Sequence, residues 1–92
     1  MKRERLQIYY TGRVQNVGFR YTVKSVANGF EVTGTVRNLE DGRVELVCEG
    51  ARAELEGFHH AIQDSEAGRF IRNEAVMWSE VKNEFRGFEI IR

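Results

Sequence analysis

The stretch LQIYYTGRVQNVGFRYTVKSVANG, residues 6–29, changes the period of its hydrophobic pattern once along its length. Leu6, Ile8 and Tyr10 occupy every second position, which is typical of a half-buried strand. From Phe19 onward, apolar side chains recur three or four residues apart, which indicates one face of a helix. Glycine-bounded residues 12–18 separate the two patterns. The sequence therefore predicts a strand, a loop and a helix in that order.

The rest of the chain extends this order into a complete fold. The patterns predict strands over residues 31–38 and 43–49, a helix over 51–64, a loop over 65–69, and strands over 74–82 and 85–91. In the strand over 74–82, we expect Val76, Trp78 and Val81 to contact the core. The intervening Asp41-Gly42 pair is a strong hairpin signal. The series is the split β-α-β pattern of a ferredoxin-like sandwich. We expect an α+β βαββαβ fold, with two helices on one face of a mainly antiparallel sheet and a short extra C-terminal strand.

Length and composition favour one small domain. The 92 residues fit a single domain spanning positions 1–92, and 14 basic residues balance 14 acidic ones. A formal charge of zero gives no general attraction to nucleic acid or to an anionic membrane. The chain has one cysteine, no secretory leader pattern and no apolar run of about 20 residues. We therefore expect a cytoplasmic monomer with no nucleic-acid or membrane partner.

The loop GRVQNVGFR, residues 12–20, has the features of an anion-binding site. Backbone N–H groups at a helix N-terminus are unpaired and attract anions, and Gly18 permits close backbone approach. Arg20 falls in the first helical turn, where its charge opposes the helix dipole. Its planar guanidinium group suits a phosphate, because it can donate two parallel hydrogen bonds. An ordinary solvent-exposed arginine that follows a glycine-containing loop would show the same pattern. The Gly-Lys-Ser/Thr ending of a Walker A loop is absent.

A second polar position is Asn38, at the end of the strand over residues 31–38. An asparagine at this place often initiates a turn. A neutral amide can also hold a water molecule, because it both accepts and donates hydrogen bonds. The spacing alone leaves both readings open.

Taken together, the two stretches resemble the signatures of the acylphosphatase family. GRVQNVGFR is similar to the family's Gly-x-Val-Gln-Gly-Val-x-Phe-Arg loop, and GTVRN followed by DGRVE is similar to its second motif. The separation of the two motifs fits as well. The resemblance is strong over residues 5–50 and weaker beyond, where the hydrophobic pattern and the last strand carry it.

This resemblance implies an activity and assigns residues to it. Family members hydrolyse acyl phosphates to a carboxylate and inorganic phosphate without a metal, a cofactor or a phosphoenzyme. By the matching positions, Arg20 would bind the substrate phosphate together with the N–H groups of Gln15, Asn16, Val17, Gly18, Phe19 and Arg20 itself. Asn38 would orient the attacking water. Acetyl, carbamoyl and glyceroyl phosphates share the reactive end that this loop would bind, and phosphate would bind as product or inhibitor.

Asn16 departs from the family motif, since it stands where the second loop glycine is usual. That glycine suggests a positive φ angle, and asparagine tolerates the left-handed region best among the other residues. If the Asn16 side chain crowds the phosphate, the domain would bind anions without catalysis. An RNA-binding domain of the same fold is the other alternative, because Tyr9, Tyr10 and Phe88 are strand aromatics. The RNP1 pattern is missing, however.

Two further candidates have simpler explanations. His59 and His60 are adjacent on a helix, so their rings point about 100° apart and cannot easily share a metal. We expect a surface pair and no metal site. Cys48 alternates with Val44 and Leu46, which predicts a buried small hydrophobic residue rather than a nucleophile.

Overall fold

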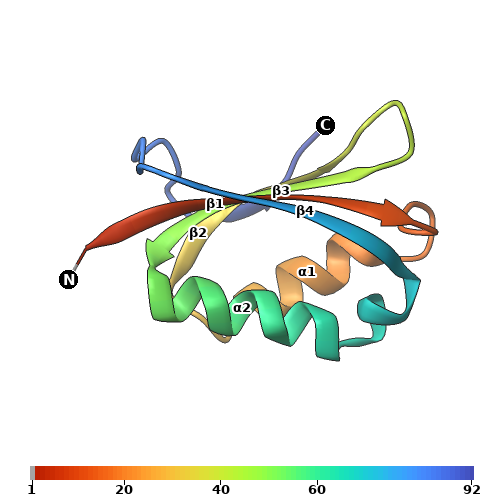
Figure 1. Ribbon diagram of the computed structural model, residues 1–92, viewed down its shortest axis with the longest axis horizontal. Helices are drawn as coiled ribbons and strands as arrows, with labels where there is room; N and C mark the ends of the chain where they lie inside the picture. Colours follow the sequence, from red (N-terminus) through yellow and green to blue (C-terminus); the bar gives the residue numbers. More distant parts are fainter. Residues whose placement is uncertain (1) are drawn as a thin grey trace.

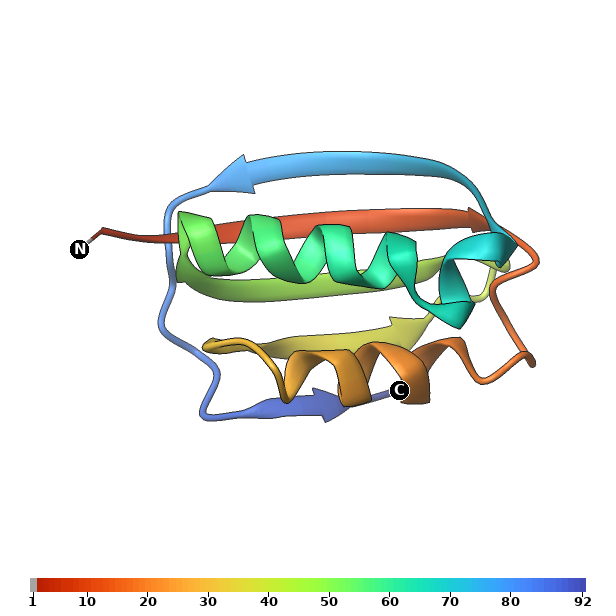
Figure 2. The same ribbon diagram turned by 90° about the horizontal axis from the view of Figure 1, so that it is seen from below.

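The computed structural model describes residues 2–92, as two helices and a short 3-10 helix packed on a five-stranded sheet (Figure 1). The elements are β1 (Arg3–Gly12), α1 (Phe19–Ala27), β2 (Val32–Asn38), β3 (Val44–Ala51), α2 (Arg52–Asp64), η1 (Glu66–Phe70), β4 (Ile71–Ser79) and β5 (Phe88–Ile90). The strand order is β4-β1-β3-β2-β5. All neighbouring strands are antiparallel except β2 and β5. Both helices lie on one face (Figure 2), so the predicted ferredoxin-like sandwich with an extra strand is confirmed.

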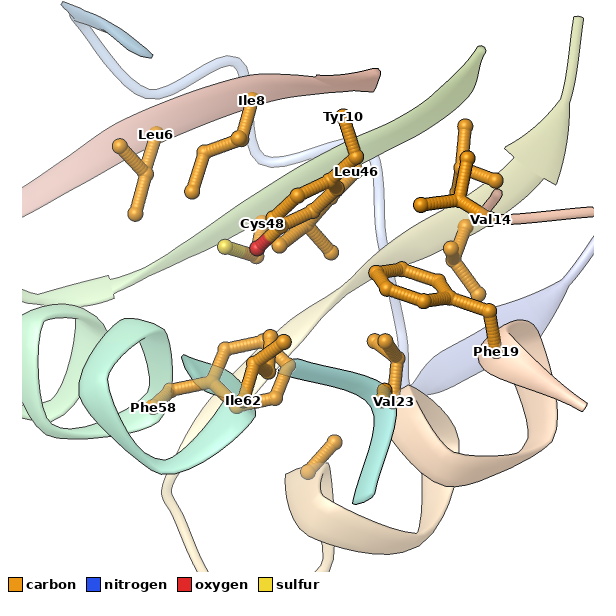
Figure 3. Close-up of a cluster of buried hydrophobic side chains, with 14 of the residues drawn as sticks. Leu6, Ile8, Tyr10, Val14, Phe19, Val23, Leu46, Cys48, Phe58 and Ile62 are labelled. Atoms are coloured by element: carbon orange, nitrogen blue, oxygen red, sulfur yellow. The ribbon is translucent and has the colours of Figure 1, made fainter. Parts of the chain in front are cut away.

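The core lies between the sheet and the helices (Figure 3). It comprises Leu6, Ile8, Tyr10, Val36, Val44, Leu46 and Cys48 from the sheet, and Phe19, Val23, Leu55, Phe58 and Ile62 from the helices. These are the alternating strand positions and the helix positions that the hydrophobic pattern selects. Tyr10 and Phe19 meet edge to face with ring centroids 5.0 Å apart. This contact joins the end of β1 to the start of α1 beneath the loop that connects them.

The fourth strand begins three residues earlier than predicted. Ser65 ends α2 and begins η1: its hydroxyl donates to the Ile62 carbonyl at 2.6 Å and accepts from the Ala67 N–H at 3.2 Å. The predicted loop over 65–69 is therefore the 3-10 helix η1. β4 then pairs with β1 from Ile71, opposite Gly12, and ends at Ser79. Similarly, the last strand is confined to Phe88–Ile90 because only these residues pair with β2.

Two of the predicted core contacts of β4 were wrong. Val76 lies on the helix-facing side of this edge strand but remains 40% exposed, since no helix covers it. Val81 lies beyond the end of the strand and outside the buried cluster. Trp78 does pack against the cluster. Within residues 2–92, no helix is both long enough and apolar enough to cross a bilayer.

The face of the sheet away from the helices is crossed by the connection between β4 and β5 (Figure 1). Glu49 lies under this connection and is 0% exposed. Its carboxylate accepts hydrogen bonds from the N–H groups of Lys82 at 2.8 Å and Asn83 at 3.0 Å. It also pairs with the Arg5 guanidinium at 2.9 Å. A buried carboxylate thus holds the connection against the sheet.

Candidate active site

The phosphate-loop candidate lies at one end of the sheet, beside the β2–β3 hairpin and η1 (Figure 2). α1 begins at Phe19, with Gly18 as its N-cap and no side chain capping its free N–H groups. Its first turn contains no acidic residue. The helix therefore presents unpaired N–H donors and a positive dipole end to the loop, which is an arrangement that binds anions.

Two residues of this loop adopt left-handed backbone conformations. Gly18 has a φ of 78° and Asn16 a φ of 63°. The expectation of a positive φ at Asn16 is confirmed. A Cβ at Gly18 would meet nothing within 4 Å, so it is the backbone conformation rather than crowding that favours glycine there. Left-handed residues that alternate with right-handed ones turn successive N–H groups toward a common concavity, which is how backbone nests bind anions.

Gln15 fastens the loop to the hairpin through its side chain. Its Nε2 donates to the carbonyl oxygens of Leu39 at 2.8 Å and Arg43 at 3.0 Å. The two carbonyls belong to opposite arms of the β2–β3 turn, so one amide spans the turn. The sequence analysis considered only the backbone N–H of Gln15. No local pattern could reveal this clamp, because its partners lie 24 and 28 residues away along the chain.

The hairpin itself is ordered by Asp41 and Gly42. The Asp41 carboxylate accepts from the backbone N–H of Arg43 at 3.1 Å and from its Nε at 2.8 Å. The backbone hydrogen bond from Arg43 is the main reason why the pKa of Asp41 is lowered. Gly42 supplies the positive φ, 95°, that the turn needs. This turn holds the two carbonyls to which Gln15 binds.

Arg20 is the second residue of α1 and is half-buried. None of the ion pairs among residues 2–92 includes its guanidinium. A permanent positive charge in the first helical turn opposes the helix dipole, and it is electrostatically unfavourable unless an anion binds beside it. Arg20 therefore has both the position and the free donors to bind an anion at this helix end.

Asn38 is the last residue of β2, and its neighbour Leu39 accepts the hydrogen bond from Gln15. The Oδ1 of Asn38 is buried, with no hydrogen-bond donor among the described residues. A buried acceptor without a partner costs about 1–3 kcal/mol, so such an atom marks a place for a polar ligand or water. The Gln15 clamp thus brings the predicted loop and the predicted amide to the same end of the sheet.

The remaining sequence candidates do not join this site. Cys48 is buried, and burial raises the pKa of its thiol to about 12, which rules out a thiolate nucleophile near neutral pH. Among residues 2–92 no cluster of three metal-binding side chains occurs. His60 is exposed as predicted, but the prediction for His59 was wrong: its ring is half-buried, and Nε2 lies 2.8 Å from Glu74 Oε1.

The three strand aromatics do not form one stacking surface. Tyr10 is 0% exposed in the core, and Phe88 packs against Phe58 with centroids 5.6 Å apart. Only Tyr9 lies on the uncovered face, where the Arg43 guanidinium sits 4.6 Å from its ring centroid. A platform for stacked bases needs neighbouring exposed aromatic faces, which these residues do not provide.

Comparison with known proteins identifies the family of this chain. The family model described as Acylphosphatase matches residues 6–90. The chain belongs to the acylphosphatase family. The acylphosphatase of Trichormus variabilis is 42% identical over 88 residues, which cover 96% of this chain and 86% of the relative. Acylphosphatases are hydrolases of acyl phosphates, so this chain is an enzyme with a small-molecule acyl phosphate substrate and a site for phosphate.

Solved structures show the same fold. The crystal structure of acylphosphatase from Bacillus subtilis superposes with a TM-score of 0.88 at 32% identity, covering 97% of this chain and 99% of that one. Full-length HypF in its phosphate- and nucleotide-bound form matches with a TM-score of 0.85 at 28% identity. This match covers 99% of the present chain but 12% of HypF. The acylphosphatase fold therefore also occurs as a small part of a much larger protein.

Proposed function

We propose that the chain hydrolyses acyl phosphates by direct attack of a water molecule that Asn38 orients. Arg20 and the backbone N–H groups of residues 15–20 hold the phosphoryl group. The observation that carries this assignment is the buried, unpartnered Oδ1 of Asn38, next to the hairpin residue to which Gln15 fastens the loop. This oxygen can accept a hydrogen bond from a water molecule. That bond would orient the water so that a lone pair of its oxygen points at the phosphorus.

The reaction requires little from the protein beyond position and charge. The water oxygen forms a bond to phosphorus while the bond between phosphorus and the carboxyl oxygen breaks. The carboxylate leaves with the bonding electrons, and the water's proton passes to a phosphate oxygen. Such transfers pass through a loose transition state, so positioning and electrostatic stabilisation supply most of the catalysis. The Arg20 fork and the loop N–H groups would stabilise the equatorial oxygens of that state.

Hydrolysis of benzoyl phosphate tests this proposal, with a chelator present and with Arg20→Ala and Arg20→Lys measured beside the wild type. We expect chelator-resistant turnover that Arg20→Ala lowers by about 100-fold or more. Arg20→Lys should recover little, because one ammonium cannot replace two parallel donors. Arg86→Ala, a change of an exposed arginine in the β4–β5 connection, is the matched control. Near-normal turnover in Arg20→Lys would contradict the assigned role.

We also propose that residues 1–92 form one domain that is monomeric and acts in the cytoplasm on free acyl phosphates. The charge balance and the single small core support this proposal. Light scattering coupled to gel filtration, at protein concentrations spanning about two orders of magnitude, should give one constant mass. A mass that doubles with concentration would replace the monomer with a dimer.

A further inference from the structure

An open cleft of about 470 Å³ lies where β1 ends and β4 begins. It is lined by Gly12, Arg13, Arg69, Phe70, Ile71 and Arg72. Three of these six residues are basic and none is acidic, in a chain whose 14 basic and 14 acidic residues balance overall. We call Arg13, Arg69 and Arg72 the arginine cleft. The arginine cleft concentrates positive charge at one place, although the chain as a whole has no net charge.

The guanidinium groups of the arginine cleft are free of acidic partners. The ion pairs found between residues 2 and 92 include none of the three, and all three residues are exposed. Arg69 lies over the ring of Phe70, with 4.9 Å between the guanidinium carbon and the ring centroid. Stacking restrains a guanidinium but leaves the N–H donors at its edge able to bind a carboxylate or phosphate.

The backbone fixes how these arginines lie relative to one another. The Arg13 N–H donates to the Phe70 carbonyl at 3.1 Å. The register of β1 against β4 shifts between Thr11 and Gly12, and Gly12 has a φ of 135°. A Cβ at Gly12 would lie 2.8 Å from the Arg72 nitrogen, so glycine permits the close approach. The cleft is therefore built into the end of the sheet and does not depend on a mobile segment.

The cleft adjoins the phosphate loop. Arg13 precedes Gln15 by two residues, and a fully extended chain spans about 3.3–3.6 Å per residue, so their Cα atoms are within about 7 Å. The cleft and the loop are therefore close neighbours at the same end of the sheet. Phe70 and Ile71 add apolar surface between the charges, which suits the carbon skeleton of an acyl group.

We propose that the arginine cleft binds a second negative charge on the acyl group, so the enzyme prefers acyl phosphates that carry a further carboxylate or phosphate. This inference rests on the proposed function, since the phosphoryl end must occupy the loop. The preference is expressed in kcat/KM and does not alter the reaction itself. Because the cleft is open to solvent, its contribution weakens as salt is added.

Three related substrates test the preference: benzoyl phosphate, 4-carboxybenzoyl phosphate and the neutral 4-carbamoylbenzoyl phosphate. The measured quantity is the ratio of kcat/KM for the carboxy compound to that for the carbamoyl compound. We expect a ratio above one in wild type, and a fall of about two- to fivefold in Arg69→Gln and in Arg72→Gln, as for a solvent-exposed ion pair. Arg86→Gln, remote from the cleft, should keep the wild-type ratio.

The outcomes separate the two proposals. If wild type hydrolyses benzoyl phosphate but the ratio is one, or does not change in the cleft variants, the arginine cleft has no part in substrate choice. If the ratio resists about 1 M salt, the preference does not come from exposed charges and the inference is wrong. If wild type hydrolyses none of the three substrates, the proposed function fails and the substrate preference fails with it.

Discussion

The side chain of Gln15 and the carbonyl of Leu39 are joined by a 2.8 Å hydrogen bond, which fixes the proposed phosphate-binding loop to the residue after Asn38. The same amide reaches Arg43 at 3.0 Å. The loop would supply the phosphate donors, and β2 would supply the water-orienting amide. Catalysis by positioning requires these two parts to keep a constant separation. We therefore propose that the side chain of Gln15 positions the loop, while its backbone N–H is one of the donors that would hold the phosphoryl group.

Gln15→Ala should lower turnover while the protein stays folded. Both carbonyls keep a backbone partner, Gly42 N–H at 3.2 Å for Leu39 and Leu39 N–H at 2.8 Å for Arg43. The loss of free energy of unfolding should therefore be about 1–2 kcal/mol. Turnover of benzoyl phosphate should fall about 10-fold or more, because small misplacements at a reacting centre are costly.

Gln63→Ala is the control for that experiment, since its amide donates to Glu74 of β4 rather than to the hairpin. Turnover should stay at the wild-type level in this control. A Gln15→Ala protein with normal kcat would show that the loop keeps its place without the clamp. Urea unfolding of both variants separates misplacement from general loss of structure.

Asn16→Gly should leave turnover unchanged or raise it. Asn16 and Asn83 are the non-glycine residues of positive φ in the described part of the chain. Glycine adopts this conformation without strain and removes a side chain from the loop that would hold the phosphate. Asn83→Gly makes the same change at a φ of 54° in the β4–β5 connection and controls for general effects. A clear fall in kcat that is specific to Asn16→Gly would show that the amide has its own role at the site.

Asn38→Ala should lower kcat more than it weakens phosphate binding. In the proposed mechanism the amide would act on the water, whereas Arg20 and the loop would hold the phosphoryl group. We expect kcat to fall about 100-fold and the inhibition constant of phosphate to change less than about threefold. The change also removes a buried acceptor without a partner, which offsets the lost packing. Equal losses in kcat and phosphate affinity would make Asn38 a binding residue instead.

Local sequence patterns predicted much of this fold because the responsible interactions are local or periodic. The alternation of Leu6, Ile8 and Tyr10 places these residues in the core, and the loop motif anticipates the left-handed conformation at Asn16. The start of β4 was missed because its register depends on the bulge at Gly12.

The clamp by Gln15 and the burial of Glu49 join segments far apart in sequence. A lone glutamine or glutamate in such positions looks like a solvated residue. Glu49 is buried because the connection between β4 and β5 covers it, which the local sequence pattern does not indicate. Only the assembled sheet reveals these contacts.

The buried Glu49 should make stability depend on pH in a specific window. Burial by itself raises the pKa of this carboxyl, but the N–H groups of Lys82 and Asn83 and the Arg5 guanidinium outweigh burial, and the pKa is lowered. Unfolded glutamate titrates near pH 4.3, as measured in model peptides, so the unfolded chain takes up a proton first. The stabilisation is therefore fully present above about pH 5 and is lost as the pH falls through the lowered pKa of the folded state.

Urea unfolding of wild type and Glu49→Gln between pH 7 and pH 3 measures this contribution. At pH 7 the variant should lose about 1–3 kcal/mol of unfolding free energy, because an amide NH2 group replaces one carboxylate oxygen and cannot accept the hydrogen bonds made to that oxygen. The difference between the two proteins should shrink below about pH 4, since protonation removes the same charge from wild type. Glu84→Gln is the matched control: Glu84 also pairs with Arg5, at 3.3 Å, but its side chain is 57% exposed. That variant should differ little from wild type at either pH, as expected for an exposed pair. Parallel pH profiles for wild type and Glu49→Gln would mean that other carboxylates, such as Glu45 and Asp41, govern the acid sensitivity instead.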